Sequence, residues 1–158
     1  MFGFEFFSFL TLQSFVGSLI RVARAMKFEI GQPQVYDMRD DSPTSFAETL
    51  DRVCSEMNPV LIFCVVSNNR LDRYAAIKKR CCVDRPVPTQ VMVSRNLQPG
   101  KSQMSIATKV AIQMNCKIGG VPWGISIPLK GLMVVGFDVC HDTAKKNRDF
   151  GQFKIFEF

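Results

Sequence analysis

Apolar residues recur along this chain with two different spacings, which alternate. From Leu12 to Met26 they return every three or four residues, as on one face of an amphipathic helix. The same spacing runs from Phe46 to Met57, where Ser45 and Glu48 have the spacing of a capping box that would start the helix. Val60–Val66 is instead a continuous apolar run. It predicts a strand that is buried on both faces of a parallel sheet.

The rest of the chain continues this alternation. A helix is expected from the SerAsnAsn at 67–69 to about Cys82, where two prolines prevent its continuation. Further elements are expected as a strand at 89–93, a helix at 103–115 capped by Ser102, and strands at 125–128 and 132–139, the last apolar enough to be central. The order predicts an α/β fold with a mainly parallel sheet, whose ligands bind at the carboxyl ends of strands.

The positive charge of the chain is concentrated in one region. With 158 residues and 47% hydrophobic content, the chain is long enough for one ordinary core, and its formal charge is +6. Residues 67–120 hold ten Lys or Arg against two acidic residues, whereas the remainder holds ten basic and twelve acidic ones. Such a region attracts polyanions, of which nucleic acid or phosphate comes first and an anionic membrane second; a solvated basic face is the plain alternative.

Neither the cysteines nor the apolar start of the chain indicates secretion. The six cysteines include one inside the apolar run and one adjacent pair, without paired CxxC spacing, so we expect reduced and mostly buried thiols in a cytosolic or nuclear protein. The first twenty residues lack a basic start, since Glu5 is the first charge and Arg21 the first base. Polar residues interrupt them, so neither a signal peptide nor a membrane span is predicted.

Several polar residues stand out against these apolar elements. Tyr74 and Lys78 lie four apart and would share one face of a helix. A second helix would carry a polar ridge of Lys109, Gln113 and Lys117, and Gln90 at the start of a strand could join both groups. Two lysines with amide donors suit a terminal phosphate, and a tyrosine suits a stacked base. The alternative is lysines whose stems cover apolar surface beside a tyrosine that fills the sheet edge.

Three segments of the chain resemble a known family. They are VSNNRLDRYAAIKKRCCVDRPVPTQV, MSIATKVAIQMNCKIGG and IPLKGLMVVGFDVCHDT. Together they resemble the MID domain and the first strand of the PIWI domain of Piwi-clade Argonaute proteins. The resemblance implies a Rossmann-like MID domain at 12–129 with a mainly parallel sheet, and a truncated start of an RNase H-like PIWI domain at 130–151. Residues 1–11 and 152–158 diverge from the family.

The resemblance implies a function in RNA-guided silencing of genes and transposons. The chain would hold the 5′-phosphate and first base of a single-stranded guide RNA of the Piwi-interacting class. Lys78, Gln90, Gln113 and Lys117 would contact the phosphate, and Tyr74 would stack on the base. Many relatives have lysine at the position of Gln113, so the resemblance leaves room for a Mg²⁺ ion at the phosphate and implies no other cofactor. The loop 68–73 corresponds to the segment that reads the first base, usually uridine.

The same resemblance places Asp138 at the first of the family's catalytic carboxylates. Because one aspartate cannot hold the ions of a two-metal site, we expect no catalytic residue, no slicing and no enzymatic role. The alternatives are a truncated interaction fragment or pseudogene-like product without effective RNA binding, and a nuclease subunit that regains carboxylates by association. We expect a cytoplasmic or nuclear location, no membrane partner, and protein partners through an exposed PIWI-facing surface.

Overall fold

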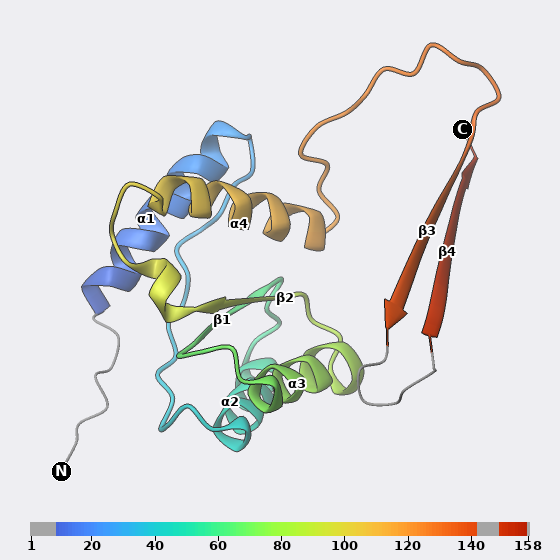
Figure 1. Ribbon diagram of the computed structural model, residues 1–158. Coiled ribbons are helices and arrows are strands. Elements are labelled where there is room, and N and C mark those ends of the chain that lie inside the picture. Colours follow the sequence, from blue (N-terminus) through green and yellow to red (C-terminus); the bar gives the residue numbers. More distant parts are fainter. Residues whose placement is uncertain (1–8, 142–148, 158) are drawn as a thin grey trace. The chain divides into compact units, whose positions relative to one another are not determined.

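The computed structural model describes residues 9–141 and 149–157, with side chains described for residues 9–137. The chain divides into two compact units, one up to Trp123 and one from Gly124 (Figure 1). None of the helices in the described ranges is long and apolar enough to cross a membrane.

The first unit is an α/β/α arrangement around two parallel strands (Figure 1). Helices α1 and α4 cover one face of the sheet, and α2 and α3 cover the other. The elements are α1 (Phe9–Ala25), α2 (Pro43–Glu56), β1 (Ile62–Val66), α3 (Leu71–Lys79), a π-helical turn (Arg80–Asp84), β2 (Thr89–Val93), a 3-10 turn (Ser94–Leu97) and α4 (Gln103–Lys117). The strands pair in parallel from Ile62 opposite Thr89 to Val66 opposite Val93.

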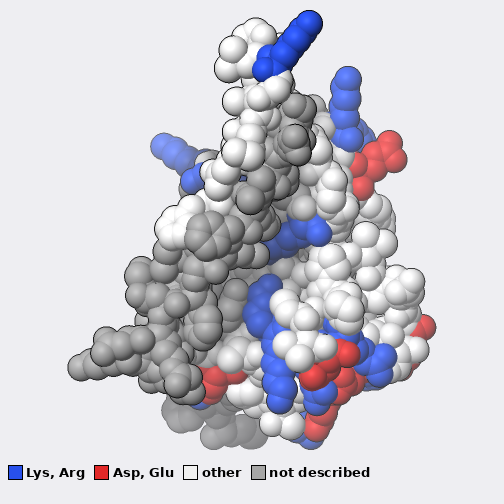
Figure 2. All heavy atoms as spheres, turned by 90° about the vertical axis from the view of Figure 1, so that its right-hand side faces the viewer, with Lys and Arg blue, Asp and Glu red and all other residues white. Residues whose placement is uncertain are grey.

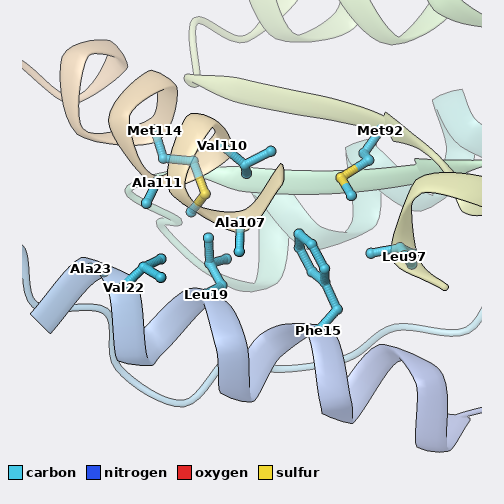
Figure 3. Packing of buried hydrophobic residues seen from close by; sticks show 10 residues of the cluster. All are labelled: Phe15, Leu19, Val22, Ala23, Met92, Leu97, Ala107, Val110, Ala111 and Met114. Atoms are coloured by element: carbon cyan, nitrogen blue, oxygen red, sulfur yellow. The ribbon is translucent and has the colours of Figure 1, made fainter. Parts of the chain in front are cut away.

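Alternation along the strands divides the buried side chains into two cores. Side chains of successive strand residues point to opposite faces, so Phe63, Val65 and Met92 pack toward α1 and α4. Figure 3 shows that core, in which Phe15, Leu19, Val22 and Ala23 of α1 meet Ala107, Val110, Ala111 and Met114 of α4. Cys64 and Val66 face the other way, where they join Phe46, Leu50, Ile77 and Cys81 from α2, α3 and the π-helical turn.

The predicted helices are all present, but α2 begins earlier than expected. Ser42, and not Ser45, is the N-cap, and its hydroxyl accepts a hydrogen bond of 3.1 Å from the Ser45 backbone N–H. Pro43 follows at the first helical position, where its missing N–H costs nothing. Ser102 lies at the N-cap of α4 but makes no capping hydrogen bond with its side chain.

The prediction of a strand buried on both faces within a mainly parallel sheet is only partly correct. In β1, Cys64 and Val66 are buried, whereas Ile62, Phe63 and Val65 are half-buried. Within the described residues, the sheet of the first unit has only these two strands. An α/β class with a small parallel sheet therefore holds, while the wider parallel sheet is absent from the described residues.

The second unit contains an antiparallel hairpin of β3 (Met133–His141) and β4 (Asp149–Glu157). The strand predicted at 132–139 is thus present, but within the described residues it pairs only with β4 and is not central. Met133, Val134, Val135 and Phe137 are 41–64% exposed. The strand predicted at 125–128 does not form, and these residues are irregular and exposed.

The cysteines whose side chains are described agree with the prediction of free thiols, but fewer of them are buried than expected. Cys54, Cys64, Cys81, Cys82 and Cys116 are free thiols, of which only Cys64 and Cys81 are buried. Burial raises the pKa of the Cys64 thiol to about 12 and that of Cys81 to about 11. These two thiols are therefore protonated and unreactive at neutral pH. The side chain of Cys140 lies outside those described.

Candidate functional site

The candidate site is at the amino end of β2, where two neighbouring residues face opposite layers. Thr89 and Gln90 are both buried, with 3% and 7% of their surface exposed. Because successive side chains alternate across a strand, Thr89 is directed toward α3 and Gln90 toward α4. The start of one strand thereby meets functional groups from helices on both faces of the sheet.

Two lysines, one from each helix, converge on this point. The Lys78 ammonium donates to the Thr89 hydroxyl at 2.7 Å and to its carbonyl at 3.4 Å. Lys117 donates to the same carbonyl at 2.8 Å and to Oε1 of Gln90 at 2.6 Å. The amide nitrogen of Gln90 in turn donates to Oε1 of Gln113 at 3.0 Å. We call Lys78, Thr89, Gln90, Gln113 and Lys117 the lysine cluster.

No carboxylate among the described side chains balances the ammonium groups of Lys78 and Lys117. Among the described side chains, every ion pair is formed by an arginine, and neither Lys78 nor Lys117 has an acidic partner. Partial burial, and secondly the charge of Lys78, lower the pKa of Lys117 below its usual value of 10.5. Two cations that share a neutral carbonyl are underneutralised, so the cluster is suited to bind an anion.

The distribution of charge on the surface is uneven. In Figure 2, some Lys and Arg side chains have no Asp or Glu atoms beside them, whereas lower on the same face acidic and basic side chains lie against one another. The pairs Arg70–Asp72 and Arg80–Asp84, at 2.6 and 3.1 Å, are of the second, neutralised kind. The excess of positive charge in residues 67–120 therefore comes mainly from lysines, which have no acidic partner among the described side chains.

An aromatic ring adjoins the cluster. The Lys78 ammonium lies 5.6 Å from the centre of the Tyr74 ring, within the range of a cation–π contact. Tyr74 is 48% exposed, so part of the ring is accessible to a ligand. Beside it is a pocket of about 260 Å³ lined by Val66, Asn68, Asn69, Arg70, Leu71, Tyr74, Val91 and Val93. The Tyr74 ring thus adjoins both Lys78 of the cluster and the small pocket.

The structure brings together the residues singled out from the sequence, with one omission and one addition. Lys78, Gln90, Gln113 and Lys117 form one hydrogen-bonded network, and Tyr74 contacts it through Lys78. Lys109 of the same ridge is exposed and outside the network. Sequence reasoning missed Thr89, on which both lysines converge, because its role depends on where two helices on opposite faces of the sheet end.

The site also lies elsewhere than the fold class alone suggested. Ligands were expected at the carboxyl ends of strands, but the lysine cluster surrounds the amino end of β2. The reason is that the lysines come from the last turns of α3 and α4, which run antiparallel to the strands and end beside the strand start. Only the pocket next to Tyr74 follows the expected rule, since Val66 is the last residue of β1.

The fit of a divalent ion depends on the donor atoms present. No group of three or more His, Cys, Asp or Glu that could hold a metal ion occurs among the residues that the structure describes. The lysine cluster offers ammonium and amide groups, which suit an anion better than Mg²⁺, a cation that prefers carboxylate and phosphate oxygens. The residues of the lysine cluster are therefore unsuited to be the ligands of a Mg²⁺ ion.

Asp138, the residue predicted to match a catalytic carboxylate, is in β3 opposite Gln152. Its side chain lies outside those described, so the geometry of a catalytic group around it stays a prediction.

Comparisons with known proteins identify relatives of this chain. The family described as the Piwi domain matches residues 61–154. The chain is 51% identical over 141 residues to Piwi-like protein Siwi of Bombyx mori and 43% identical over 145 residues to protein aubergine of Drosophila melanogaster. These alignments cover 89% of this chain but only 16% and 17% of the two relatives. The chain thus spans about a sixth of the length of the curated relatives it matches.

Solved structures agree with this relationship. Drosophila Piwi matches with a TM-score of 0.81 and 38% identity, over 94% of this chain and 22% of that chain. Aa-Ago, solved with externally bound siRNA, matches with a TM-score of 0.64 over 98% of this chain and 23% of that chain. At 19% identity, the second match shows the fold alone.

One prediction from the sequence is overturned by these matches. The expectation that the chain is not an enzyme is wrong, because residues 61–154 match the Piwi domain, which is RNase H-like and nuclease-related. A single recognisable carboxylate, Asp138, is too little to decide the class of a chain that spans a sixth of its relatives. The resemblance itself is confirmed: with more than half of its residues in the family match, the chain belongs to the Piwi family of Argonaute-type proteins.

Proposed function

We propose that the first unit binds the 5′-phosphorylated end of a single-stranded guide RNA and acts as the MID domain of a Piwi protein. The observation that carries this proposal is the convergence of Lys78 and Lys117 on the Thr89 carbonyl without a carboxylate partner among the described residues. A terminal phosphate supplies the missing negative charge. Membership in the Piwi family supports RNA as the molecule that carries the phosphate.

Each residue of the cluster has a chemical role in this proposal. Lys78 and Lys117 donate hydrogen bonds to phosphate oxygens. Such charge-assisted hydrogen bonds are stronger than those between neutral groups. Gln90 accepts from Lys117 and donates to Gln113, so it holds the ammonium and the second amide in place. Gln113 is exposed and can turn its own amide nitrogen toward the phosphate.

Tyr74 supplies the surface for the first base. Its half-exposed ring adjoins both Lys78 and the pocket. Stacking of a base on an aromatic side chain tolerates any base and contributes about 1–3 kcal/mol. Phosphate capture and base stacking therefore act on the same terminal nucleotide.

The test compares one short RNA with and without its 5′-phosphate at two salt concentrations, using the 158-residue chain. A phosphate-dependent difference in Kd that persists at the higher salt supports a defined pocket. A generic basic surface would bind both RNAs alike, with affinity that falls steeply with salt, and this outcome would reject the proposal.

Matched lysine variants make the test specific. Lys78→Ala and Lys117→Ala should each weaken binding of the phosphorylated RNA by about 10- to 150-fold, the equivalent of about 1.5–3 kcal/mol for a hydrogen bond to a charged group. Lys79→Ala and Lys109→Ala remove exposed lysines from the same two helices and should change Kd by less than about threefold. Equal effects in all four variants would contradict the assignment of the phosphate to the lysine cluster.

A further inference from the structure

A buried arginine lies immediately behind the loop that borders the pocket. Arg73, in the first turn of α3, is 4% exposed. Its guanidinium pairs with the Asp41 carboxylate at 3.0 Å and donates to the Asp41 carbonyl at 2.8 Å. It also donates to the Ser67 hydroxyl at 3.1 Å and to Oδ1 of Asn68 at 3.3 Å. Four interactions therefore converge on one buried side chain.

These contacts connect two segments that are far apart in the sequence. Asp41 precedes α2, whereas Ser67 and Asn68 follow β1, and the Ser67 backbone N–H also donates to the Asp41 carboxylate at 3.3 Å. A buried guanidinium is costly unless its donors are satisfied. Its planar fork satisfies them here in one geometry, so the loop after β1 is fixed against the turn before α2.

The consequence for the pocket falls on Asn68. Asn68 lines the pocket, but neither Arg73 nor Asp41 does. Its Oδ1 accepts from the Arg73 guanidinium and also from the Arg70 backbone N–H at 3.2 Å. With the oxygen engaged by two donors, the amide cannot turn over, and its nitrogen, which has no partner among the described residues, is the group offered to a ligand.

We propose that Arg73, through its pairing with Asp41, is a positioning residue that sets the base preference of the pocket by holding the Asn68 amide with its nitrogen outward. This rests on the proposed function, in which the first base lies against Tyr74. If the amide N–H faces the 4-substituent of a pyrimidine or the 6-substituent of a purine, it favours uracil and guanine, whose O4 and O6 are acceptors. It disfavours cytosine and adenine, which carry an amino group at the same position.

The experiment measures Kd for four 5′-phosphorylated RNAs that differ only in the first nucleotide, and for their unphosphorylated counterparts. Wild-type chain should prefer U and G over A and C by about fivefold or more. Arg73→Lys keeps the charge but cannot make the fork, and Asp41→Asn keeps the shape but removes the ion pair. In both variants the preference should fall to about twofold or less, while phosphate-dependent binding is retained. Arg39→Lys, an exposed arginine paired with Asp40 in the same turn, should behave as wild type.

The outcomes separate this inference from the function on which it rests. Absence of phosphate dependence in the wild-type chain would overturn the proposed function and this inference with it. Phosphate-dependent binding with no U and G preference, or with the preference intact in both variants, would overturn the positioning role alone. If Arg73→Lys loses all binding, the Asp41→Asn variant tests the positioning role instead. That variant keeps the hydrogen bond from Arg73 to the backbone carbonyl of residue 41 and removes only the ion pair. Loss of both readouts in both variants would assign the pair to the fold and reject the positioning role.

Discussion

Replacing Gln90 by glutamate would supply the lysine cluster with an anion of its own. Oε1 of Gln90 lies 2.6 Å from the Lys117 ammonium and is buried. A carboxylate at this point keeps the size and the acceptor but adds a full negative charge. We expect Gln90→Glu to weaken binding of 5′-phosphorylated RNA strongly, because the phosphate then meets a site that is already neutralised and a like charge beside it.

The size of this effect follows from the geometry. Two like charges about 5 Å apart at an effective dielectric constant of about 20 repel by about 3 kcal/mol. Since Lys117 is exposed, solvent reduces this figure, and we expect a loss of about 1.5–3 kcal/mol, or about 10- to 150-fold in Kd. The RNA-free chain should gain no more than about 1 kcal/mol of stability from the new ion pair, since Lys117 is exposed and burial of the new carboxylate offsets part of the attraction.

The assay is fluorescence anisotropy with labelled RNA, with and without the 5′-phosphate, combined with urea unfolding of the RNA-free chain. Gln98→Glu is the matched control, because it makes the same charge change at an exposed glutamine after the 3-10 turn. Binding of the phosphorylated RNA by Gln90→Glu at wild-type strength would refute the placement of the phosphate at the cluster. So would an equal loss in Gln98→Glu, because net charge alone would then explain it.

Three further predictions concern the ring, the protonation state and the core. Tyr74→Ala should cost about 1–3 kcal/mol of RNA binding while Tyr74→Phe retains it, as measured by Kd; a loss in the Phe variant would point to the hydroxyl instead of stacking. Because the pKa of Lys117 is lowered, phosphate-dependent affinity should decline as pH rises toward 10.5, and the decline should move to higher pH in Lys117→Arg. In the same window the RNA-free chain should become more stable, since its unfolded state binds more protons than its folded state. Phe15→Ala should lower the free energy of unfolding by about 3–5 kcal/mol, against less than about 0.5 kcal/mol for Leu10→Ala, which is 72% exposed.

Much of the lysine cluster could be predicted because the spacing of residues along a helix determines which of them share a face. Four-residue spacing puts Tyr74 and Lys78 on one face of any helix, and the same holds for Gln113 and Lys117. Thr89 could not be predicted as their meeting point. Its role depends on how two helices on opposite faces end relative to one strand, and no local spacing encodes that relation.

The errors in the fold have similar physical causes. Ser42 and Ser45 are both good caps, and the choice between them depends on Pro43, which fits the first helical turn. The apolar run at 132–139 shows that these side chains favour burial, but it does not specify a partner that would cover them. Val134 and Val135 are therefore exposed in β3 although their composition is that of a buried strand.

The start of β2 joins the two helical layers through adjacent residues, with Thr89 held by Lys78 and Gln90 by Lys117. A phosphate that binds both lysines would therefore connect α3 to α4 across the end of the sheet. Such a ligand binds only the folded unit, so at a hundred times its Kd it would add about 2.7 kcal/mol to the free energy of unfolding. Binding of an RNA end and stabilisation of the fold would then be thermodynamically coupled. The unit without RNA would unfold more readily than the unit with RNA bound.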